Sequence, residues 1–230
     1  MIDFGRAVQH PFEDRDWLVK ILIGAGVSLI PILNFAVTGY SLEVLRNSSH
    51  NRDVPLPQWD DLGRHFVDGL KLFVVMLVYA IPLFVVIFGI SFAGVGFGIV
   101  SDRLSRSAQD AAGIVFGILT LTFTCLTLLY GLFYAFIEPA LYIQVARTGQ
   151  ISSGFNFKEI KGIIGRNSGD YVLVVLVPLM IGFAFSIVFG VIGLIPFVAL
   201  CLVFLMIPVM VFLVPYIQIV FGHLYGQLIR

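Results

Sequence analysis

Charged residues are scarce in this chain of 230 residues, where aspartate, glutamate, lysine and arginine together make up only 12%. Soluble domains carry about 25%, so half of the charged surface that water would require is missing. Hydrophobic residues reach 59%, and the mean hydropathy is +0.99. A chain of this length cannot hide so much apolar surface in a core, whereas lipid can replace water around its exterior. The composition predicts an all-α, polytopic membrane protein.

Cysteines are few, and catalytic motifs are missing. Cys125 and Cys201 both lie inside apolar runs and are interpreted as small buried hydrophobes, not as a disulfide or a metal pair. The net charge is zero, which argues against the basic footprint of a nucleic-acid-binding protein. No phosphate loop, nucleophile elbow, paired carboxylates or zinc-ligand spacing occurs. We therefore expect no enzymatic activity, no cofactor, no metal and no nucleic-acid partner.

A secretory signal is also missing from the start of the chain. Residues 1–16 are rich in charge, whereas a signal peptide would have a basic start and a short apolar core. We expect residues 1–16 to be a cytoplasmic leader and residues 17–230 to form a single membrane domain.

Four apolar stretches are long enough to cross a bilayer, which takes about 20 helical residues. They cover residues 69–100, 111–146, 170–195 and 197–229. A fifth stretch, residues 18–45, is either one long helix or two short helices broken between Pro31 and Asn34.

Lysine and arginine decide between these alternatives, because they collect on the cytoplasmic side of a membrane protein. One helix over residues 18–45 would divide the basic residues five to nine between the two sides, whereas a hairpin divides them twelve to two. The hairpin is therefore predicted, which gives about six membrane helices and two cytoplasmic termini. Its first helix, residues 17–31, would be only ~22 Å long against a core of ~30 Å, so a re-entrant hairpin stays open. Asn34 is expected to cap the broken backbone.

Two short segments that precede spans share one amphipathic pattern. Apolar residues recur at i, i+3 and i+7, as on one face of a helix: Trp59, Leu62 and Phe66, then Phe157, Ile160 and Ile164. Such helices lie in the headgroup layer, so we predict interfacial anchors at Trp59, Phe66, Phe157, Ile160 and Ile164. Asn156 followed by Glu159 is typical of a capping box. With a fainter copy at the start, the pattern predicts three helical-hairpin repeats, over residues 12–58, 59–156 and 157–230.

Three polar residues in or near the spans are candidates for a function: Asn34, Glu138 and His223. A carboxylate inside a membrane is costly and points to function by default. However, a span of about 22 residues from Ala112 ends before Glu138, which favours a place in the headgroup region near Arg147. A single histidine such as His223 more often forms an interfacial hydrogen bond than a metal site.

The first third of the chain carries motifs that belong together. They are Trp17-Leu-Val-Lys20, Gly24, Leu29-Ile-Pro31-Ile-Leu-Asn34-Phe35, Gly39-Tyr40, Val44-Leu45-Arg46-Asn47, Pro55-Leu-Pro57-Gln-Trp59-Asp60-Asp61-Leu62 and Phe66-Val-Asp68-Gly69-Leu-Lys71. Through these motifs, over about residues 12–75, the chain resembles the bacterial and archaeal membrane family known as domain of unknown function 4013. The resemblance implies a multi-pass membrane protein without an assigned activity, and it carries over no functional residues.

Two functions fit these patterns best, ahead of a membrane-bound enzyme, whose site would have to lie in the polar segments 46–68 and 147–168. The first is a non-enzymatic module of the cytoplasmic membrane that binds lipid or assembles with other membrane proteins or with copies of itself. The alternative is a small transporter or channel-like protein. Against transport, the spans hold few polar residues to line a path, and threonines such as Thr122 and Thr124 often bond to their own helix.

Overall fold

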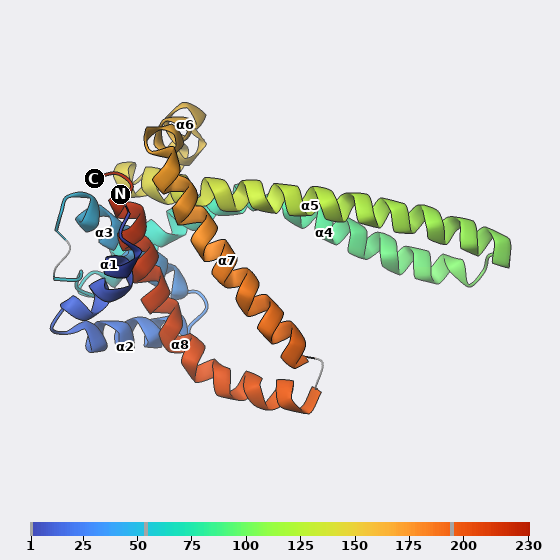
Figure 1. Ribbon diagram of the computed structural model, residues 1–230, viewed down its shortest axis with the longest axis horizontal. Coiled ribbons are helices and arrows are strands. Elements are labelled where there is room, and N and C mark those ends of the chain that lie inside the picture. Colours follow the sequence, from blue (N-terminus) through green and yellow to red (C-terminus); the bar gives the residue numbers. More distant parts are fainter. Residues whose placement is uncertain (1, 53–54, 194–195) are drawn as a thin grey trace. The chain divides into compact units, whose positions relative to one another are not determined.

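The computed structural model describes residues 2–52, 55–193 and 196–230, and every regular element in these ranges is a helix (Figure 1). The elements are α1 (Phe4–Gln9), η1 (His10–Glu13), α2 (Trp17–Ser28), α3 (Asn34–Ser49), α4 (Leu62–Ser101), α5 (Arg106–Thr148), η2 (Ile151–Phe155), α6 (Phe157–Arg166), α7 (Ser168–Gly193) and α8 (Pro196–Gln227). The prediction of an all-α protein is confirmed for this part of the chain.

Four described helices, α4, α5, α7 and α8, are long and apolar enough to cross a membrane. They correspond to the four predicted stretches, but α4 and α5 begin several residues earlier because polar turns continue each helix beyond its apolar part. By contrast, α2 has 12 residues and a length of ~18 Å. The predicted count of six membrane helices therefore stays a prediction.

The helical structure is interrupted between α2 and α3, as the sequence around Pro31 predicts. The predicted capping role of Asn34 is wrong. Leu33 occupies the N-cap position without a side-chain hydrogen bond, and Asn34 is the first residue of α3. Its backbone N–H donates to the carbonyl oxygen of Ile30 at 3.1 Å. Because backbone groups inside the turn satisfy one another, the helix starts without a side-chain cap.

Two compact units make up the chain. The larger unit comprises residues 1–75 and 138–230, and thus contains the first turns of α4 and the last turns of α5. The hairpin unit is Met76–Ile137, the remaining parts of α4 and α5 with their connecting turn.

Helix α3 forms the centre of the larger unit, and most of its residues from Ala36 to Leu45 are buried. Glycines let the start of α4 approach it closely. A Cβ atom on Gly39 would overlap the carbonyl oxygen of His65, and one on Gly69 would overlap that of Phe35. The two backbones therefore touch where they cross, which only glycine permits.

Helix α8 packs along another side of α3 (Figure 1). Its contact residues include Gly222 and Gly226, four residues apart, where added Cβ atoms would overlap the carbonyl oxygen of Ser41 and the side chain of Ser48. The Ser48 hydroxyl also donates to the carbonyl oxygen of His223 at 3.2 Å. This spacing of small residues is the one that brings membrane helices into backbone contact.

The two ends of the chain are hydrogen-bonded to each other. The Asp3 N–H donates to Gln227 Oε1 at 2.8 Å, and Gln227 Nε2 donates to the Asp3 carbonyl oxygen at 3.2 Å. The segment that follows Asp3 packs on α8, where the His10 ring stacks on the His223 ring with centroids 4.2 Å apart.

The hairpin unit consists of two antiparallel helical segments with an apolar exterior. Phe97 stacks on Phe116 at 4.8 Å, and the Tyr130 hydroxyl donates to the carbonyl oxygen of Tyr79 at 2.8 Å. Most large side chains on both segments point outward, and Phe92 is 74% exposed.

Candidate functional site

The loop before α4, residues 55–61, is held by a buried ion pair in the larger unit. Lys20 Nζ lies 2.9 Å from Asp14 Oδ2, and each side chain is at least 96% buried. Both partners also bind Leu56: its N–H donates to Asp14 Oδ2 at 2.7 Å, and its carbonyl oxygen accepts from Lys20 Nζ at 2.7 Å. A buried ion pair persists only when its remaining polar atoms are also hydrogen-bonded, and Leu56 supplies those bonds.

The environment of Asp14 keeps its carboxyl group charged. Burial alone would raise the pKa of Asp14. Hydrogen bonds from Lys20 and from the backbone N–H groups of Asp16 and Leu56 outweigh burial and hold the pKa below its ordinary value of 3.8. The Asp14 side chain is therefore a carboxylate at neutral pH.

An aromatic stack holds the rest of the loop. The Trp59 ring lies parallel to the Tyr40 ring at 4.3 Å, and its indole N–H donates to the carbonyl oxygen of Lys20 at 2.9 Å. The Tyr40 hydroxyl donates to the Pro57 carbonyl oxygen at 2.8 Å. Together with the ion pair, these contacts fix the loop between α2 and α3. We call Asp14, Lys20, Tyr40, Leu56 and Trp59 the loop clamp.

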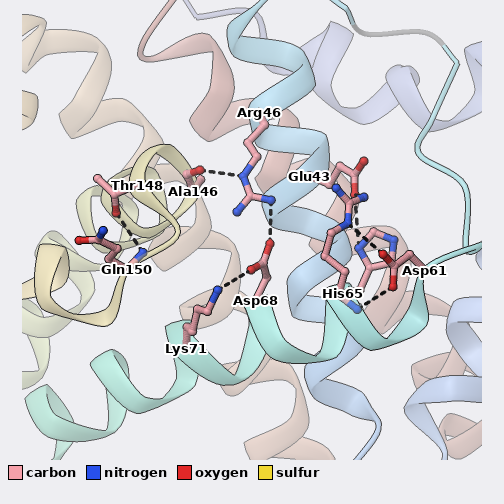
Figure 2. Close-up of polar contacts among 10 residues, drawn as sticks. Glu43, Arg46, Asp61, His65, Asp68, Lys71, Ala146, Thr148 and Gln150 are labelled. Atoms are coloured by element: carbon pink, nitrogen blue, oxygen red, sulfur yellow. Dashed lines mark hydrogen bonds and ion pairs between the residues drawn. The ribbon is translucent and has the colours of Figure 1, made fainter.

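A second polar cluster joins α3 to α4 and to the end of α5 (Figure 2). Arg46 donates to Asp68 Oδ2 at 2.8 Å and to the Ala146 carbonyl oxygen at 2.7 Å. Asp68 also accepts from Lys71 at 3.1 Å. One turn earlier on α3, Glu43 pairs with Arg64. These contacts link α3, α4 and the end of α5 to one another.

The end of α5 borders a hollow of about 470 Å³ with a polar lining, which we call the polar hollow. Gly149, with φ at +66°, ends the helix and turns the chain into η2 and α6. The Gln150 N–H donates to the Thr148 hydroxyl at 3.2 Å within this turn (Figure 2). The hollow is lined by Gln144, Arg147, Thr148, Gln150, Ser152, Ser153, Asn156 and Glu159.

A smaller hollow of about 210 Å³ shares Arg147 and Glu159 with the polar hollow. We call it the arginine hollow, because Arg166 from α6 also lines it. Ile163 and Leu228 also line it. Arginines, amides and hydroxyls that face these two neighbouring hollows can bind a ligand with an anionic group and several hydroxyl groups.

Comparison with known families places residues 23–194, three-quarters of the chain, in the family described as "Protein of unknown function (DUF4013)". The chain belongs to this family. The predicted resemblance is thereby confirmed, and the match reaches well beyond the motif-bearing residues into α7. No curated protein matches the chain. No solved structure matches it either.

The residues that carry the resemblance to DUF4013 gather around α3. Trp59 and Tyr40 stack in the loop clamp, Arg46 pairs with Asp68, and Gly39 and Gly69 form the contact between α3 and α4. In this chain the motifs therefore hold helices together. The segment from residue 59 to 66 is not a separate short helix, since α4 begins at Leu62 and runs on to Ser101.

The second predicted interfacial segment is a helix of its own, α6. Asn156 caps it as predicted, its side chain accepting from the Glu159 N–H at 3.3 Å. Ile160 is buried and Ile164 is half-buried, whereas Phe157 is 65% exposed. Of the predicted anchors in the first segment, Trp59 is half-buried in the loop clamp and Phe66 packs edge-on against Phe35 at 6.0 Å. An interfacial role for these residues stays a prediction.

Glu138 and His223 lie in different surroundings. Glu138 is half-buried, close enough to the Tyr171 and Tyr225 hydroxyls to interact with them electrostatically. It forms no ion pair with Arg147 among the described residues, and the nine helical steps from Glu138 to Arg147 correspond to ~13 Å along α5. His223 is fully buried, with Nδ1 3.1 Å from Gln227 Nε2.

No group of three potential metal ligands occurs in residues 2–52, 55–193 and 196–230. Sequence reasoning missed the pairing of Asp14 with Lys20 and the hollows at the end of α5. The hollows could have been suspected from Gln144, because it is a polar residue within the apolar run from Leu141 to Ala146.

Proposed function

We propose that this chain is an integral, non-enzymatic module of the cytoplasmic membrane that binds lipid and assembles with other membrane proteins or with copies of itself. Four membrane-length apolar helices and membership of DUF4013 support a place in the membrane. The preference for a cytoplasmic membrane rests on the distribution of lysine and arginine along the chain.

The observation that carries this proposal is the apolar exterior of the hairpin unit. In the most apolar 18-residue stretch of α5, no residue is buried in the structure. Side chains such as Phe92, Leu121 and Leu128 are more than 60% exposed. Such surfaces are stable only against lipid or against apolar helices of another protein.

The hydroxyl groups of the hairpin unit argue against transport. Thr122, Thr124 and Thr127 each donate to a carbonyl oxygen one turn earlier in α5, at 2.7–2.8 Å. A hydroxyl that is bonded to its own helix does not replace the hydration shell of a solute. Transport thus lacks the polar path that it would need in this unit.

A photo-crosslinking experiment tests the proposal. A benzophenone amino acid replaces Phe92 or Leu128, and intact membranes are irradiated. We expect adducts to lipid and to discrete membrane proteins or a second copy, because these side chains are among the most exposed apolar groups of the hairpin unit. The same amino acid in place of Arg103, in the turn between α4 and α5, serves as the control and should give no lipid adduct.

Crosslinks only to residues of the same chain would contradict the proposal, since the hairpin would then be covered internally. Transport is tested in parallel in proteoliposomes. Wild type and Glu138→Gln should give equal background leakage of ions and small solutes. Flux that depends on Glu138 would replace the proposal with the transport alternative.

We further propose that α2 and α3 form a re-entrant hairpin, so that only four helices cross fully. The length of α2 is ~18 Å against a core of ~30 Å. In addition, Glu43 and Arg46 occupy the second half of α3 and pair with residues of α4. Both termini still lie on one side, which the hydrogen bonds between Asp3 and Gln227 support.

Cysteine labelling tests this topology in a background with Cys125→Ser and Cys201→Ser. Ile32, at the tip of the hairpin, is 68% exposed in the structure. We expect Ile32→Cys to resist a membrane-impermeant maleimide in intact cells, whereas Arg103→Cys reacts from outside. Phe157→Cys should react only after permeabilisation. Labelling of Ile32→Cys from outside would instead favour six full spans.

A further inference from the structure

Arg147 and Glu159 line both the polar hollow and the arginine hollow. The residues that line the two hollows come from the last turn of α5, from η2, from α6 and from the end of the chain. The polar hollow is lined by amides and hydroxyls, whereas the arginine hollow contains two arginines beside Ile163 and Leu228. A ligand that reaches both hollows needs an anionic group and several hydrogen-bonding groups.

Gln144 is a buried polar residue that lines the polar hollow. The residue is 95% buried, and its backbone carbonyl oxygen accepts from the hydroxyl groups of Thr148 at 3.0 Å and Ser153 at 3.4 Å. Its side-chain amide lines the polar hollow and bonds to no other residue in the part of the chain that the structure describes. The amide therefore offers two N–H donors and one acceptor oxygen to a ligand that enters the hollow.

The charges favour an anion. Arg147 and Arg166 form no ion pair with a carboxylate among the described residues, and both are exposed to the arginine hollow. Glu159 is the single carboxylate in the lining, so the two hollows carry a net charge of +1. Two guanidinium groups suit a phosphodiester, which carries one negative charge and accepts paired hydrogen bonds.

We propose that the two hollows bind one molecule of an anionic phospholipid with a polyol headgroup, of the phosphatidylglycerol type. Its phosphodiester lies between Arg147 and Arg166, and its hydroxyl groups bond to Gln144, Ser153 and Glu159. The start of the acyl chains lies against Ile163 and Leu228 at the border of the arginine hollow. This inference rests on the proposed lipid-binding function and names its lipid.

Native mass spectrometry of the full chain in mild detergent tests the site. The protein is equilibrated with equal amounts of dioleoyl-phosphatidylglycerol and dioleoyl-phosphatidylcholine. We expect wild type to retain one phosphatidylglycerol at least about tenfold more than phosphatidylcholine, because only the former lacks a fixed positive charge and offers two hydroxyl groups. Arg147→Gln combined with Arg166→Gln should abolish the preference.

A second pair of variants separates the site from general charge. Arg103→Gln with Arg106→Gln removes the same two charges at the turn of the hairpin unit and should leave retention unchanged. Gln144→Leu keeps the volume of the buried side chain and should reduce retention of phosphatidylglycerol several-fold. Elution volume and unfolding temperature show that each variant is folded.

Three results would overturn the proposal. They are equal retention of the two lipids by wild type, unchanged preference in the Arg147 and Arg166 double variant, and full displacement of lipid by millimolar glycerol 1-phosphate. The last would identify a soluble phosphate compound as the ligand. If the hairpin unit crosslinks to lipid but the protein retains neither lipid selectively, only this binding site is refuted. If the protein retains phosphatidylglycerol selectively but the hairpin unit crosslinks only within its own chain, only the assembly proposed for the hairpin unit is refuted.

Discussion

Replacing Gly39 with alanine is expected to destabilise the larger unit by more than about 3 kcal/mol, beyond the usual range for an overpacked core. The new methyl group would overlap the carbonyl oxygen of His65, and this atom belongs to the backbone of α4. A flexible side chain could move aside, but here α3 and α4 must separate. Separation would also stretch the contact at Gly69, where the same two helices touch.

The measurement is the unfolding midpoint in mixed micelles of a mild detergent and sodium dodecyl sulfate. Gly26→Ala is the matched control, because Gly26 lies in α2 with open space around the position of its Cβ. Alanine there should stabilise by up to about 1 kcal/mol through its helix propensity. Equal midpoints for Gly39→Ala and Gly26→Ala would show that α3 and α4 do not meet as described.

Lys20→Met should cost about 3–5 kcal/mol, the typical loss when one partner of a buried ion pair is removed. Methionine fills a similar volume but leaves the Asp14 carboxylate buried without its cation and removes one donor from the Leu56 carbonyl oxygen. The loop before α4 would lose its attachment to α2. The same micelle titration measures the effect.

Arg64→Met is the comparison for this variant. Arg64 is 52% exposed and pairs with Glu43, and exposed pairs contribute about 0–1 kcal/mol. A loss from Lys20→Met no larger than that from Arg64→Met would mean that the ion pair is hydrated and that the loop is held by other contacts.

Acid should reproduce part of the effect of Lys20→Met in wild type. The pKa of Asp14 is lower in the folded chain than its ordinary value of 3.8. Such a group stabilises the fold fully above its unfolded pKa, and this contribution is lost as the pH falls through the folded pKa. Unfolding midpoints measured from pH 6 to pH 3 should therefore fall more for wild type than for Asp14→Asn.

The sequence allowed the long helices to be predicted because each one is an uninterrupted apolar run. Pro31 indicated the break between α2 and α3, and Asn156 with Glu159 indicated the start of α6; both are confirmed. These features depend on neighbours within one turn of the chain. They can be recognised from composition and spacing alone.

The packing of α3 could not be predicted in the same way. Gly39 stands beside His65, and Gly222 beside Ser41, only after helices far apart in sequence have met. Trp59 fits an amphipathic pattern equally well as a lipid anchor or as a stacking partner of Tyr40. The pattern records that one face is apolar but does not say what covers it. The hollows at the end of α5 escaped prediction for the same reason, since Gln144 and Glu159 belong to different helices.

The contact between α3 and α8 has a consequence for biosynthesis. Ser48 and His223, which are hydrogen-bonded to each other, stand 175 residues apart. At translation rates of about 5–20 residues per second, α3 waits roughly 9–35 s for its partner helix. During this interval the face of α3 that carries Ser41 and Ser48 has no neighbour from α8. In the nascent chain another contact must therefore cover this face of α3, and the insertion machinery is the first candidate to provide it.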